Sequence, residues 1–511
     1  MNIREWVGPL VVGVVVYFVG MTGIRLYNSW NGGSEKTEFV APASALLNEP
    51  LYRSIDVENK AASYVNQYLD VITDYGVVRM DSCGAVIASM NFVRKTGGAE
   101  QSFVNIVPQK TDDYAKNMFF VACDQKTPVM YDLIHSQDLN DRVSLVYRAK
   151  GEMGSIEKTF SIYKNKCKID LELTVIPDAE KMMRVRLMWP SPVLSETVEG
   201  DFCGAVIFKK EGKRIKKAIA SLDEQLGYFN PRMFGSENKY FAHAMVKDDN
   251  QFAMRAYYSV IDKSIVSILE SAPITEKKTW NVSFYVGPKD MHSINAVSPE
   301  FEKSLDYGML AFFTKFLMYL LEKCYGFVGN FGFAIIIVTI FLKCALLPFT
   351  FKGDQKLKKM SEYAKQLSYI EQKYKHDKNA LAAAREELYR EHGMPGIGGC
   401  LPLLLQMVVL SSLSTVINNS IALYKAPFIW WIKDLSKPDP FYTLSLLIFM
   451  GMLFTLVVSG EKFDFKRVVT IIFAGVVIAV LFGASSAGLA LFVCVSIWLH
   501  IVQTQLQKVF A

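Results

Sequence analysis

The chain has 511 residues, of which 51% are hydrophobic and 21% charged, and its formal net charge at pH 7 is +6. A mean hydropathy of +0.18, together with long uncharged stretches, excludes an ordinary soluble protein and indicates a chain that crosses a membrane. The net charge is modest and no concentrated basic face is evident, so the sequence contains no motif for direct binding of nucleic acid.

Six apolar runs predict six membrane spans, because about 20 apolar residues are needed to cross about 30 Å of hydrocarbon. The first span, within residues 1–26, is predicted to be an uncleaved signal anchor, since no small-residue cleavage site follows it. A cleaved signal peptide is the alternative. The other five spans are predicted at residues 331–351, 399–420, 441–460, 468–484 and 487–507.

The distribution of Lys and Arg predicts how these spans are oriented. Ten Lys and Arg residues lie between residues 352 and 392, whereas the short segments of the opposite side carry only Lys425, Lys433 and Lys437. Because short cytoplasmic loops are enriched in Lys and Arg, we expect both termini in the cytoplasm and the large domain outside.

Residues 56–298 are predicted to form this large outer domain, joined to the first span by a linker at residues 27–55. Segments such as KIDLELTVIP (168–177) alternate apolar and polar residues, which indicates strands with one buried and one solvated face. The pattern predicts an antiparallel β-sandwich, with a helical exception at Lys213–Glu224.

The outer domain contains four cysteines: Cys83, Cys123, Cys167 and Cys203. In an oxidising compartment either disulfides or buried thiols fit, and four cysteines do not determine a pairing. The histidines of the domain are too scattered to suggest a metal site, and no nucleophile elbow is present. We therefore predict no catalytic residue, no metal and no cofactor, and a protein that is not an enzyme; binding of a sugar or peptide stays open.

Residues 299–330 are predicted to form an amphipathic helix lying along the outer membrane surface. Lys315 and Glu322 are seven residues apart and share one helix face, while Leu317 lies on the other. A helix with such faces, and with a charge at its centre, suits the interface better than the hydrocarbon.

The span predicted at residues 331–351 contains a full positive charge, Lys343. No Asp or Glu in the later spans can neutralise it, and a charge left without a partner in lipid is costly. Thr339 precedes Lys343 by four residues and shares its helix face. We expect Lys343 to border a water-filled cavity open to the cytoplasm; the alternative is that the long side chain reaches the interface.

The span predicted at residues 399–420 is unusually polar. Its Gln406 is expected at the same membrane depth as Lys343, because both lie near the cytoplasmic end of their spans. Pro348 and Pro402 are predicted to break regular helical hydrogen bonding beside the cavity. For the Ser and Thr residues of this span, helix packing alone is the alternative.

Between these two spans, residues 352–398 are predicted to form a cytoplasmic helical hairpin. Leu357, Met360 and Leu367 follow the spacing of an apolar helix stripe, and a second helix is expected over residues 381–392. The hairpin is interpreted as a mobile gate or docking arm, with a merely solvated loop as the alternative.

Several stretches taken together resemble one family, the YidC-type membrane protein insertases of bacteria. Their order along the chain is more specific than any single stretch. They are YVGPKD (285–290), LDYGML (305–310), GFVGNFGFAIIIVTIFLK (326–343), GMPGIGGCLPLLLQM (393–407), YKAPFIWWIKDLS (424–436), DPFY (439–442) and SAGLALFVCVSIWLHIVQTQLQK (486–508).

The resemblance implies an insertase core of five spans, preceded by an anchor span and an outer β-sandwich, in a bacterial inner membrane with the large domain in the periplasm. It implies a hydrophilic groove with one positive charge, and Lys343 occupies that position, where arginine is usual in the family. Lysine keeps the charge and loses the guanidinium fork. Thr339, Gln406 and Met407 fall on matching groove positions.

The implied function is the insertion and folding of nascent membrane proteins from the cytoplasm into the lipid bilayer. A Sec-type translocon and the ribosome are the further partners that the resemblance suggests. The alternatives are a transporter with a binding lysine at mid-membrane and a membrane-anchored glycan-binding protein.

Overall fold

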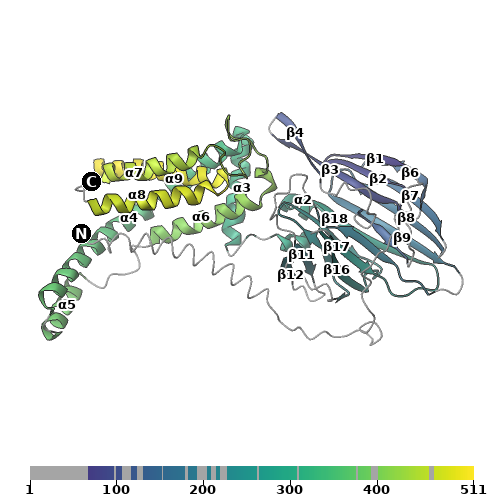
Figure 1. Cartoon of the computed structure of the whole chain (residues 1–511), viewed down its shortest axis with the longest axis horizontal. Coiled ribbons are helices and arrows are strands. Elements are labelled where there is room, and N and C mark those ends of the chain that lie inside the picture. The colour runs from purple at the N-terminus through teal and green to yellow at the C-terminus, as the bar shows by residue number, and fades with distance from the viewer. Residues whose placement is uncertain are drawn as a thin grey trace. The chain divides into compact units, whose positions relative to one another are not determined.

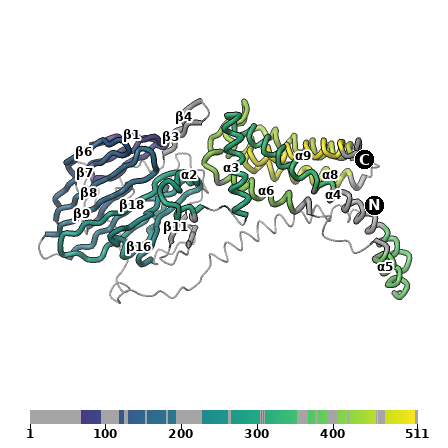
Figure 2. The backbone as a smooth tube through the Cα atoms, turned by 180° about the vertical axis from the view of Figure 1, so that it is seen from behind, coloured from purple at the N-terminus to yellow at the C-terminus, as the bar shows by residue number. Residues whose placement is uncertain are grey.

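The computed structural model describes residues 67–510, apart from residues 97–98, 106–116, 124–129, 152–153, 179–181, 193–203, 209–213, 219–226, 262–263, 306, 308–309, 376–377, 393–400 and 460–464. The predicted anchor span and linker therefore lie outside the described residues. The chain divides into two compact units. The described residues up to 305 belong to one unit, and those from Tyr307 onwards belong to the other. We call them the β unit and the helical unit, and each is described by itself (Figures 1 and 2).

The β unit contains three sheets, and every pairing between its described strands is antiparallel. The nine-stranded sheet has the order β12-β11-β14-β15-β18-β9-β8-β7-β6. Its strands are β6 (Asp132–Asp138), β7 (Arg142–Gly151), β8 (Gly154–Tyr163), β9 (Lys168–Pro177), β11 (Gly204–Phe208), β12 (Arg214–Ala218), β14 (Met233–Glu237), β15 (Phe241–Asp248) and β18 (Lys278–Pro288).

The two smaller sheets complete the β unit. The five-stranded sheet has the order β13-β16-β17-β10-β5, and the four-stranded sheet has the order β1-β2-β3-β4. Their strands are β1 (Tyr68–Thr73), β2 (Gly76–Asp81), β3 (Val86–Thr96), β4 (Ala99–Asn105), β5 (Phe120–Ala122), β10 (Arg186–Pro190), β13 (Tyr228–Phe229), β16 (Arg255–Ile261) and β17 (Ser264–Glu270). A short helix α2 (Met291–Asn295) and a 3-10 turn η4 (Pro299–Ser304) follow β18.

Strand β12 corrects one prediction from the sequence. The segment Lys213–Glu224 was predicted to be helical, yet Arg214–Ala218 is the edge strand of the nine-stranded sheet. Its Ile215 pairs in register with Ile207 of β11. Pairing with a neighbouring strand outweighs the local helix preference of a Lys-rich segment, because such preferences are small per residue.

Aromatic side chains join the nine-stranded and five-stranded sheets. Trp189 of β10 and Phe284 of β18 are both fully buried, and their ring centroids lie 5.1 Å apart at a steep angle. Phe119 contacts the same Phe284 ring, with a centroid distance of 4.7 Å. These edge-to-face contacts add to the apolar burial that holds the two sheets together. The full sandwich geometry stays a prediction.

A buried lysine supports an unusual piece of backbone beside this core. Lys158 of β8 is fully buried, and its Nζ donates to the carbonyl oxygens of Gly84 (2.6 Å), Ala85 (3.1 Å) and Phe119 (2.8 Å). Ala85 and Phe119 have positive φ angles of 43° and 69°, which are uncommon for residues with a side chain. The ammonium group therefore satisfies three buried carbonyls and holds two strained residues in place.

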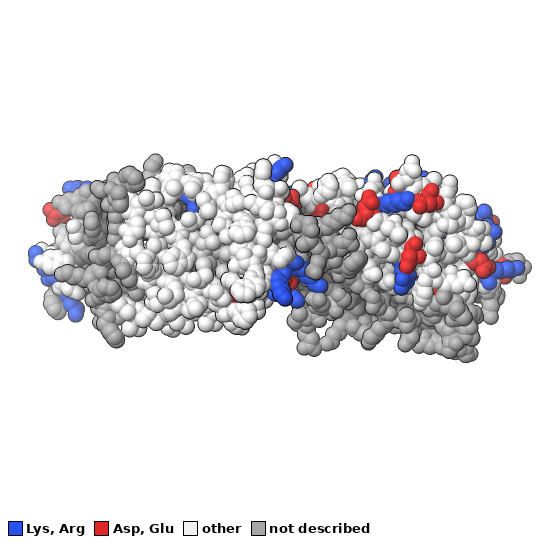
Figure 3. All heavy atoms as spheres, turned by 90° about the horizontal axis from the view of Figure 1, so that it is seen from above, with Lys and Arg blue, Asp and Glu red and all other residues white. Residues whose placement is uncertain are grey.

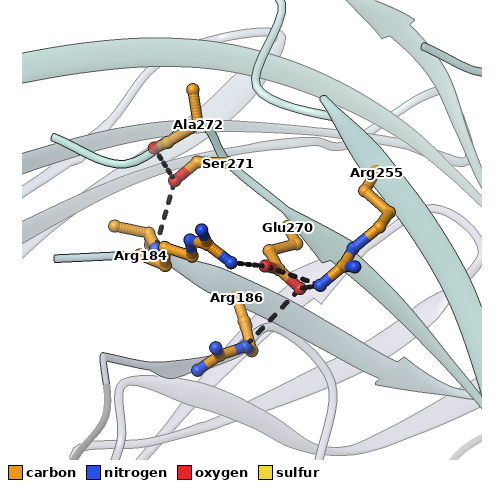
Figure 4. A network of polar contacts seen from close by, with 7 residues as sticks. Arg184, Arg186, Arg255, Glu270, Ser271 and Ala272 are labelled. Atoms are coloured by element: carbon orange, nitrogen blue, oxygen red, sulfur yellow. Dashed lines mark hydrogen bonds and ion pairs between the residues drawn. The ribbon is translucent and has the colours of Figure 1, made fainter. Parts of the chain in front are cut away.

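Charged side chains also lie inside the five-stranded sheet (Figure 4). Arg186 of β10 and Arg255 of β16 are the direct cross-strand neighbours of Glu270 on β17, one on each side. Arg255 Nη2 donates to both carboxylate oxygens of Glu270 at 3.0 and 2.9 Å, and Arg184 Nη1 reaches the same carboxylate at 3.4 Å. Glu270 is buried, so losing it would leave buried guanidinium groups without their carboxylate, a costly change.

The cysteines of the β unit are thiols in this structure where they are described. Cys83, Cys123 and Cys167 are buried and form no disulfide, and Cys203 lies outside the described residues. Burial raises the pKa of the Cys167 thiol well above its usual range, which makes it a poor nucleophile. Of the two alternatives left by the sequence, buried thiols describe these three cysteines.

The helical unit consists of seven α-helices and one 3-10 turn over its described residues. They are α3 (Ala311–Val328), α4 (Phe331–Lys373), α5 (Lys378–His392), α6 (Leu401–Asn419), η6 (Ile421–Leu423), α7 (Thr443–Ser459), α8 (Phe465–Gly483) and α9 (Ala487–Phe510). In the described ranges, Phe331–Pro348 and Ala487–Leu506 are long and apolar enough to cross a membrane, and three further apolar helices are shorter.

Helix α4 continues through Pro348 to Lys373. The predicted span at residues 331–351 and the start of the predicted hairpin at residues 352–398 therefore belong to one helix, and Pro348 removes a backbone hydrogen bond without ending it. The residues after Pro348 are rich in Lys, Gln and Glu, which favour helix, and a helix bounded by neighbours tolerates the one hydrogen bond that proline removes.

Helix α3 is shorter than the predicted amphipathic helix at residues 299–330, since it begins at Ala311. Leu317 and Leu321 are buried against the other helices, while Phe312 and Tyr319 are exposed. The ammonium of Lys315 lies 4.8 Å from the ring centroid of Tyr307. The exposed face of α3 is therefore aromatic as well as charged.

Asn330 and Gly332 connect α3 to α4 and to the loop after α6. The Asn330 side-chain oxygen accepts from the backbone N–H groups of Gly332 (2.8 Å) and Phe333, and its amide donates to the carbonyl of Phe428 at 2.8 Å. A Cβ atom at Gly332 would lie 1.9 Å from the Phe428 ring. Only glycine fits at this contact.

We predict that stability of the β unit depends on pH through His243. This side chain is fully buried, Nδ1 lies 3.0 Å from the carbonyl of Pro190, and burial lowers the pKa of His243 from 6.5 to about 4. Between these two values the unfolded chain binds a proton that the folded chain does not, so stability falls as pH falls from 6.5 towards 4. His243 should account for a loss of about 2 kcal/mol between pH 7 and pH 5.

The measurement is urea unfolding of the detergent-solubilised full chain, followed by tryptophan fluorescence at both pH values. Trp189 donates from Nε1 to the carbonyl of His243 at 3.3 Å, so it reports on this region. The variant His243→Asn retains a donor but does not titrate, and it should lose about 2 kcal/mol less than the parent protein over the same interval. Equal losses in the two proteins would contradict the assignment.

We also predict that Gly332→Ala destabilises the helical unit by about 1–3 kcal/mol, because the methyl group must displace the Phe428 ring. A matched control is Gly326→Ala on α3, where no atom lies within 4 Å of the added Cβ. The control should be neutral or slightly stabilising. The midpoint of thermal unfolding in detergent distinguishes the two, and equal midpoints would show that the loop adapts without cost.

Candidate functional site

The candidate site is built on the first half of α4, around Lys343. Val338 and Leu342 are buried in the core of the helical unit, whereas Phe341 and Cys344 are exposed. Lys343 is half-buried, so it lies on the border between the packed and the exposed side of α4. Residues 331–351, 401–419, 443–459, 468–483 and 487–507 contain no other Lys, Arg, Asp or Glu.

Thr339 lies one helical turn before Lys343. It is fully buried, and its hydroxyl donates to the carbonyl of Ile335 in the preceding turn at 2.6 Å. The hydroxyl proton is therefore used within the helix, and only the oxygen lone pairs can meet another group. Thr339 contributes a polar atom to the packed side of Lys343.

The register of α4 against α9 identifies a residue that the sequence analysis missed. A Cβ atom at Gly488 would lie 3.4 Å from Ile335, and fifteen residues further along both helices Gln503 bonds Thr350. The two helices therefore run in parallel at a constant offset, which brings Ser496 of α9 level with Lys343. Ser496 is buried, and its Oγ has no hydrogen-bond partner among the described residues.

No signal at the sequence level singles out Ser496. A lone serine in an apolar span is common and usually serves packing. Only the offset between α4 and α9 shows that its hydroxyl lies at the level of the charge. Ser412, Ser445 and Ser486 of the same unit also have buried hydroxyls without a described partner, so it is the level of Ser496 beside Lys343 that distinguishes it.

Helix α6 brings Gln406 to nearly the same level. Ile417, near the end of α6, lies level with Ile335, near the start of α4, because both approach Gly488. The two helices therefore run in opposite directions, and Val409 is level with Lys343. Gln406 lies three residues beyond Val409, or about 4.5 Å at 1.5 Å per residue.

The buried stripes of α4 and α6 end near this level, whereas α9 stays buried beyond it at Ile501 and Gln503. On α6 the buried stripe Val416, Leu413 and Val409 continues in helical spacing to Gln406, which is exposed. On α4 the buried stripe ends at Leu342, directly before Lys343. The charge and the amide thus follow the last buried layer on their helices, and neither is enclosed by it.

The remaining predicted site residues lie in less defined surroundings. Met407 is half-buried next to Gln406. Pro402 lies at the beginning of the described part of α6, and its effect on helical hydrogen bonding stays a prediction. Leu367 is half-buried on the distal part of α4; Leu357 and Met360 belong to the same helix, and their side chains lie outside the described set.

The positive charge of Lys343 determines the electrostatics of the site. Within the described part of the chain, no ion pair is formed by Lys343, and no group of three His, Cys, Asp or Glu side chains could hold a metal ion. One face of the molecule shows few charged atoms over the helical unit away from its ends (Figure 3). An ammonium group in such surroundings attracts anionic groups more strongly than it would in water.

Comparisons with known proteins match most of the chain to one family. A family model described as the 60Kd inner membrane protein matches residues 323–510, and a model of the YidC periplasmic domain matches residues 68–320. A curated membrane protein insertase YidC of Helicobacter pylori is 34% identical over 248 residues, which cover 48% of this chain and 45% of the relative. Its counterpart in Francisella tularensis subsp. novicida is 31% identical over 257 residues, covering 50% and 46%.

These alignments span less than half the length of each relative. A crystal structure described as an active YidC insertase with its first transmembrane domain resolved covers 86% of this chain and 92% of its own. At 17% identity and a TM-score of 0.37, that likeness is too distant to define the fold. The two family models together account for nearly all described residues, and the chain belongs to the YidC family of inner membrane proteins with a periplasmic domain.

Proposed function

We propose that this protein inserts nascent membrane proteins into the bacterial inner membrane and assists their folding. The observation that carries the proposal is the placement of Lys343 and Gln406 directly after the last buried residues of α4 and α6, with Ser496 at about the same level. A charge at this place needs water or a ligand, and a polar flank of an entering segment can supply the ligand.

In this proposal the chain crosses the membrane six times, both termini are cytoplasmic, and the β unit is a periplasmic sandwich. The charge distribution supports the orientation, since the segment with ten Lys and Arg residues between 352 and 392 belongs on the cytoplasmic side. The distal half of α4 then lies in the cytoplasm, and Lys343 lies in the cytoplasmic half of its span.

The proposed mechanism lowers a desolvation barrier and breaks no bond. A polar flank of the client enters between α4 and α6, where Lys343 attracts its acidic residues, while its apolar part moves along α6 into lipid. Because the polar groups at this level replace part of the water shell, the flank crosses less hydrocarbon. Membrane potential then favours outward movement of each acidic group by about 2.3 kcal/mol per 100 mV.

Lysine at this position favours one kind of selectivity. Its ammonium is a compact, strongly hydrated point charge with three donors, and it lacks the planar fork that binds a carboxylate in two places. We expect attraction to acidic flanks without a fixed geometry, which suits clients of varied sequence. The distal part of α4 with α5 is proposed to receive the client or to contact the ribosome, and a Sec-type translocon is a further proposed partner.

We predict that charge reversal at Lys343 separates clients by the charge of their translocated flank. In proteoliposomes, Lys343→Glu should slow insertion of a client with an acidic flank about tenfold or more, since attraction becomes repulsion in a medium of low dielectric. A client with a neutral flank should be affected less. The matched control Lys343→Arg retains the charge and should retain insertion of both clients.

The measurement is the protease-protected fraction of each client over time. Unchanged rates for both clients with Lys343→Glu would exclude the proposed groove mechanism. A loss with Lys343→Arg equal to that with Lys343→Glu would show that lysine geometry matters and the sign of the charge does not.

A second prediction concerns the path of the client. A photoreactive residue at Met407 should crosslink to a stalled nascent chain, because Met407 lies beside Gln406 where the packed core of α6 ends. The control position is Val469 on α8, another helix of the unit, where the side chain is also exposed. Efficient crosslinks at Val469 and none at Met407 would place the client path elsewhere.

A further inference from the structure

Helix α4 extends beyond the core of the helical unit and forms an arm together with α5. The last α4 residue of the buried core is Leu342, whereas the helix ends only at Lys373. The two helices of the arm are joined by an ion pair between Arg385 Nη2 and Glu371 Oε1 at 2.5 Å, and Leu388 is buried. Figure 1 shows α5 projecting beyond the other helices of this unit. We call residues 351–392 the arm.

The root of the arm contains a proline. Pro348 has no N–H, so the carbonyl of Cys344 lacks its regular helical donor, and long helices bend at such positions. Two residues later, Thr350 Oγ1 donates to the carbonyl of Leu347 at 2.9 Å. One backbone hydrogen bond of α4 is therefore missing at the root of the arm.

A buried side chain of the last helix binds this root. Gln503 of α9 donates from Nε2 to Thr350 Oγ1 at 2.9 Å, across 153 residues of sequence. Gln503 is buried, although glutamine is mostly exposed in proteins. Thr350 lies seven residues after Lys343, on the same face of α4. The contact therefore connects the start of the arm, the last helix and the side of α4 that carries the charge.

We infer that Gln503 is a positioning residue, whose bond to Thr350 fixes the direction in which the arm leaves the bundle at Pro348. The inference rests on the proposed function, because a fixed arm would deliver a client segment to the face that carries Lys343. Gln503 itself contacts no client. We call the bond between Gln503 and Thr350 the clasp.

The clasp is suited to favour one direction of the arm over others, because the free energy of a single hydrogen bond is enough to shift the balance between them. Hydrogen bonds between polar side chains of neighbouring membrane helices are modest on average, since each partner also finds other partners. Loss of the clasp should therefore shift the balance between arm directions about threefold, and the bundle should remain folded.

The test measures the direction of the arm without reference to insertion. Spin labels attached through ketone-bearing residues at Glu386 on α5 and Val469 on α8 leave the native cysteines unmodified, and both sites are exposed. In the full chain in nanodiscs, the parent protein should give a narrow distance distribution. Gln503→Leu and Thr350→Val should each broaden it, and the double variant should broaden it no further, because both remove the same bond.

Three control measurements distinguish the clasp from general damage. Gln505→Leu changes an exposed glutamine of the same helix and should leave the distribution narrow. Thr350→Ser retains the hydroxyl group that Gln503 binds, so its distance distribution should stay as narrow as that of the parent protein. Thermal unfolding midpoints should be similar for all variants, since one modest bond is removed.

Insertion is then measured on the same proteins. The clasp variants should insert a client with an acidic flank about threefold more slowly, with Thr350→Ser and Gln505→Leu unchanged. An unchanged distance distribution in Gln503→Leu would overturn the clasp. Broadened distances with unchanged insertion would overturn the positioning role and leave the proposed function intact, whereas a parent protein unable to insert any client would overturn the proposed function while the distances still test the clasp.

Discussion

The free energy of an ammonium group in hydrocarbon constrains the architecture of the helical unit. Lys343 is the single Lys, Arg, Asp or Glu in the apolar ranges of helices α4 and α6 to α9, so no carboxylate of these ranges offsets its charge. The buried stripes of α4 and α6 end at Leu342 and Val409, at about the level of the charge. Polar side chains follow at that level, Gln406 on α6 and Ser496 on α9. A fully packed bundle would enclose the charge at a cost of several kcal/mol.

The β unit resolves a related problem by different means, because its buried charges have partners within the unit. Lys158 donates to three carbonyl oxygens and Glu270 is bound by guanidinium groups of neighbouring strands. These contacts fix backbone and sheet register, and they consume the hydrogen-bonding capacity of the groups involved. Buried polar groups in the β unit thus specify a shape, whereas the buried hydroxyl of Ser496, level with Lys343, has no hydrogen-bond partner among the described residues.

Much of this organisation follows from the sequence, with exceptions that have physical causes. Alternation in KIDLELTVIP (168–177) predicts a strand with one buried face, because period two leaves few other solutions, and β9 buries Ile169, Leu171 and Val175. Arg214–Ala218 was missed since its strand depends on pairing with β11, which local preference does not encode. Lys343 can be predicted from the sequence as a site residue, because it is a charge within an apolar span. Ser496 cannot be predicted, because its place beside Lys343 follows only from the offset between two helices far apart in sequence.

That offset has a consequence for how the chain can change over evolution. Ile335 faces Gly488 and Thr350 bonds Gln503 at the same spacing along both helices. Inserting one residue between Ile335 and Lys343 would turn everything after it by about 100° and lift it by about 1.5 Å. The charge would leave its border position, and the contact at Thr350 would be lost. A compensating insertion in α9 would bring the residues of α4 and α9 back to the same level. It would not turn Lys343 back to its former orientation relative to α6. We expect descendants of this chain to differ by substitution in these helices and by length only in the loops.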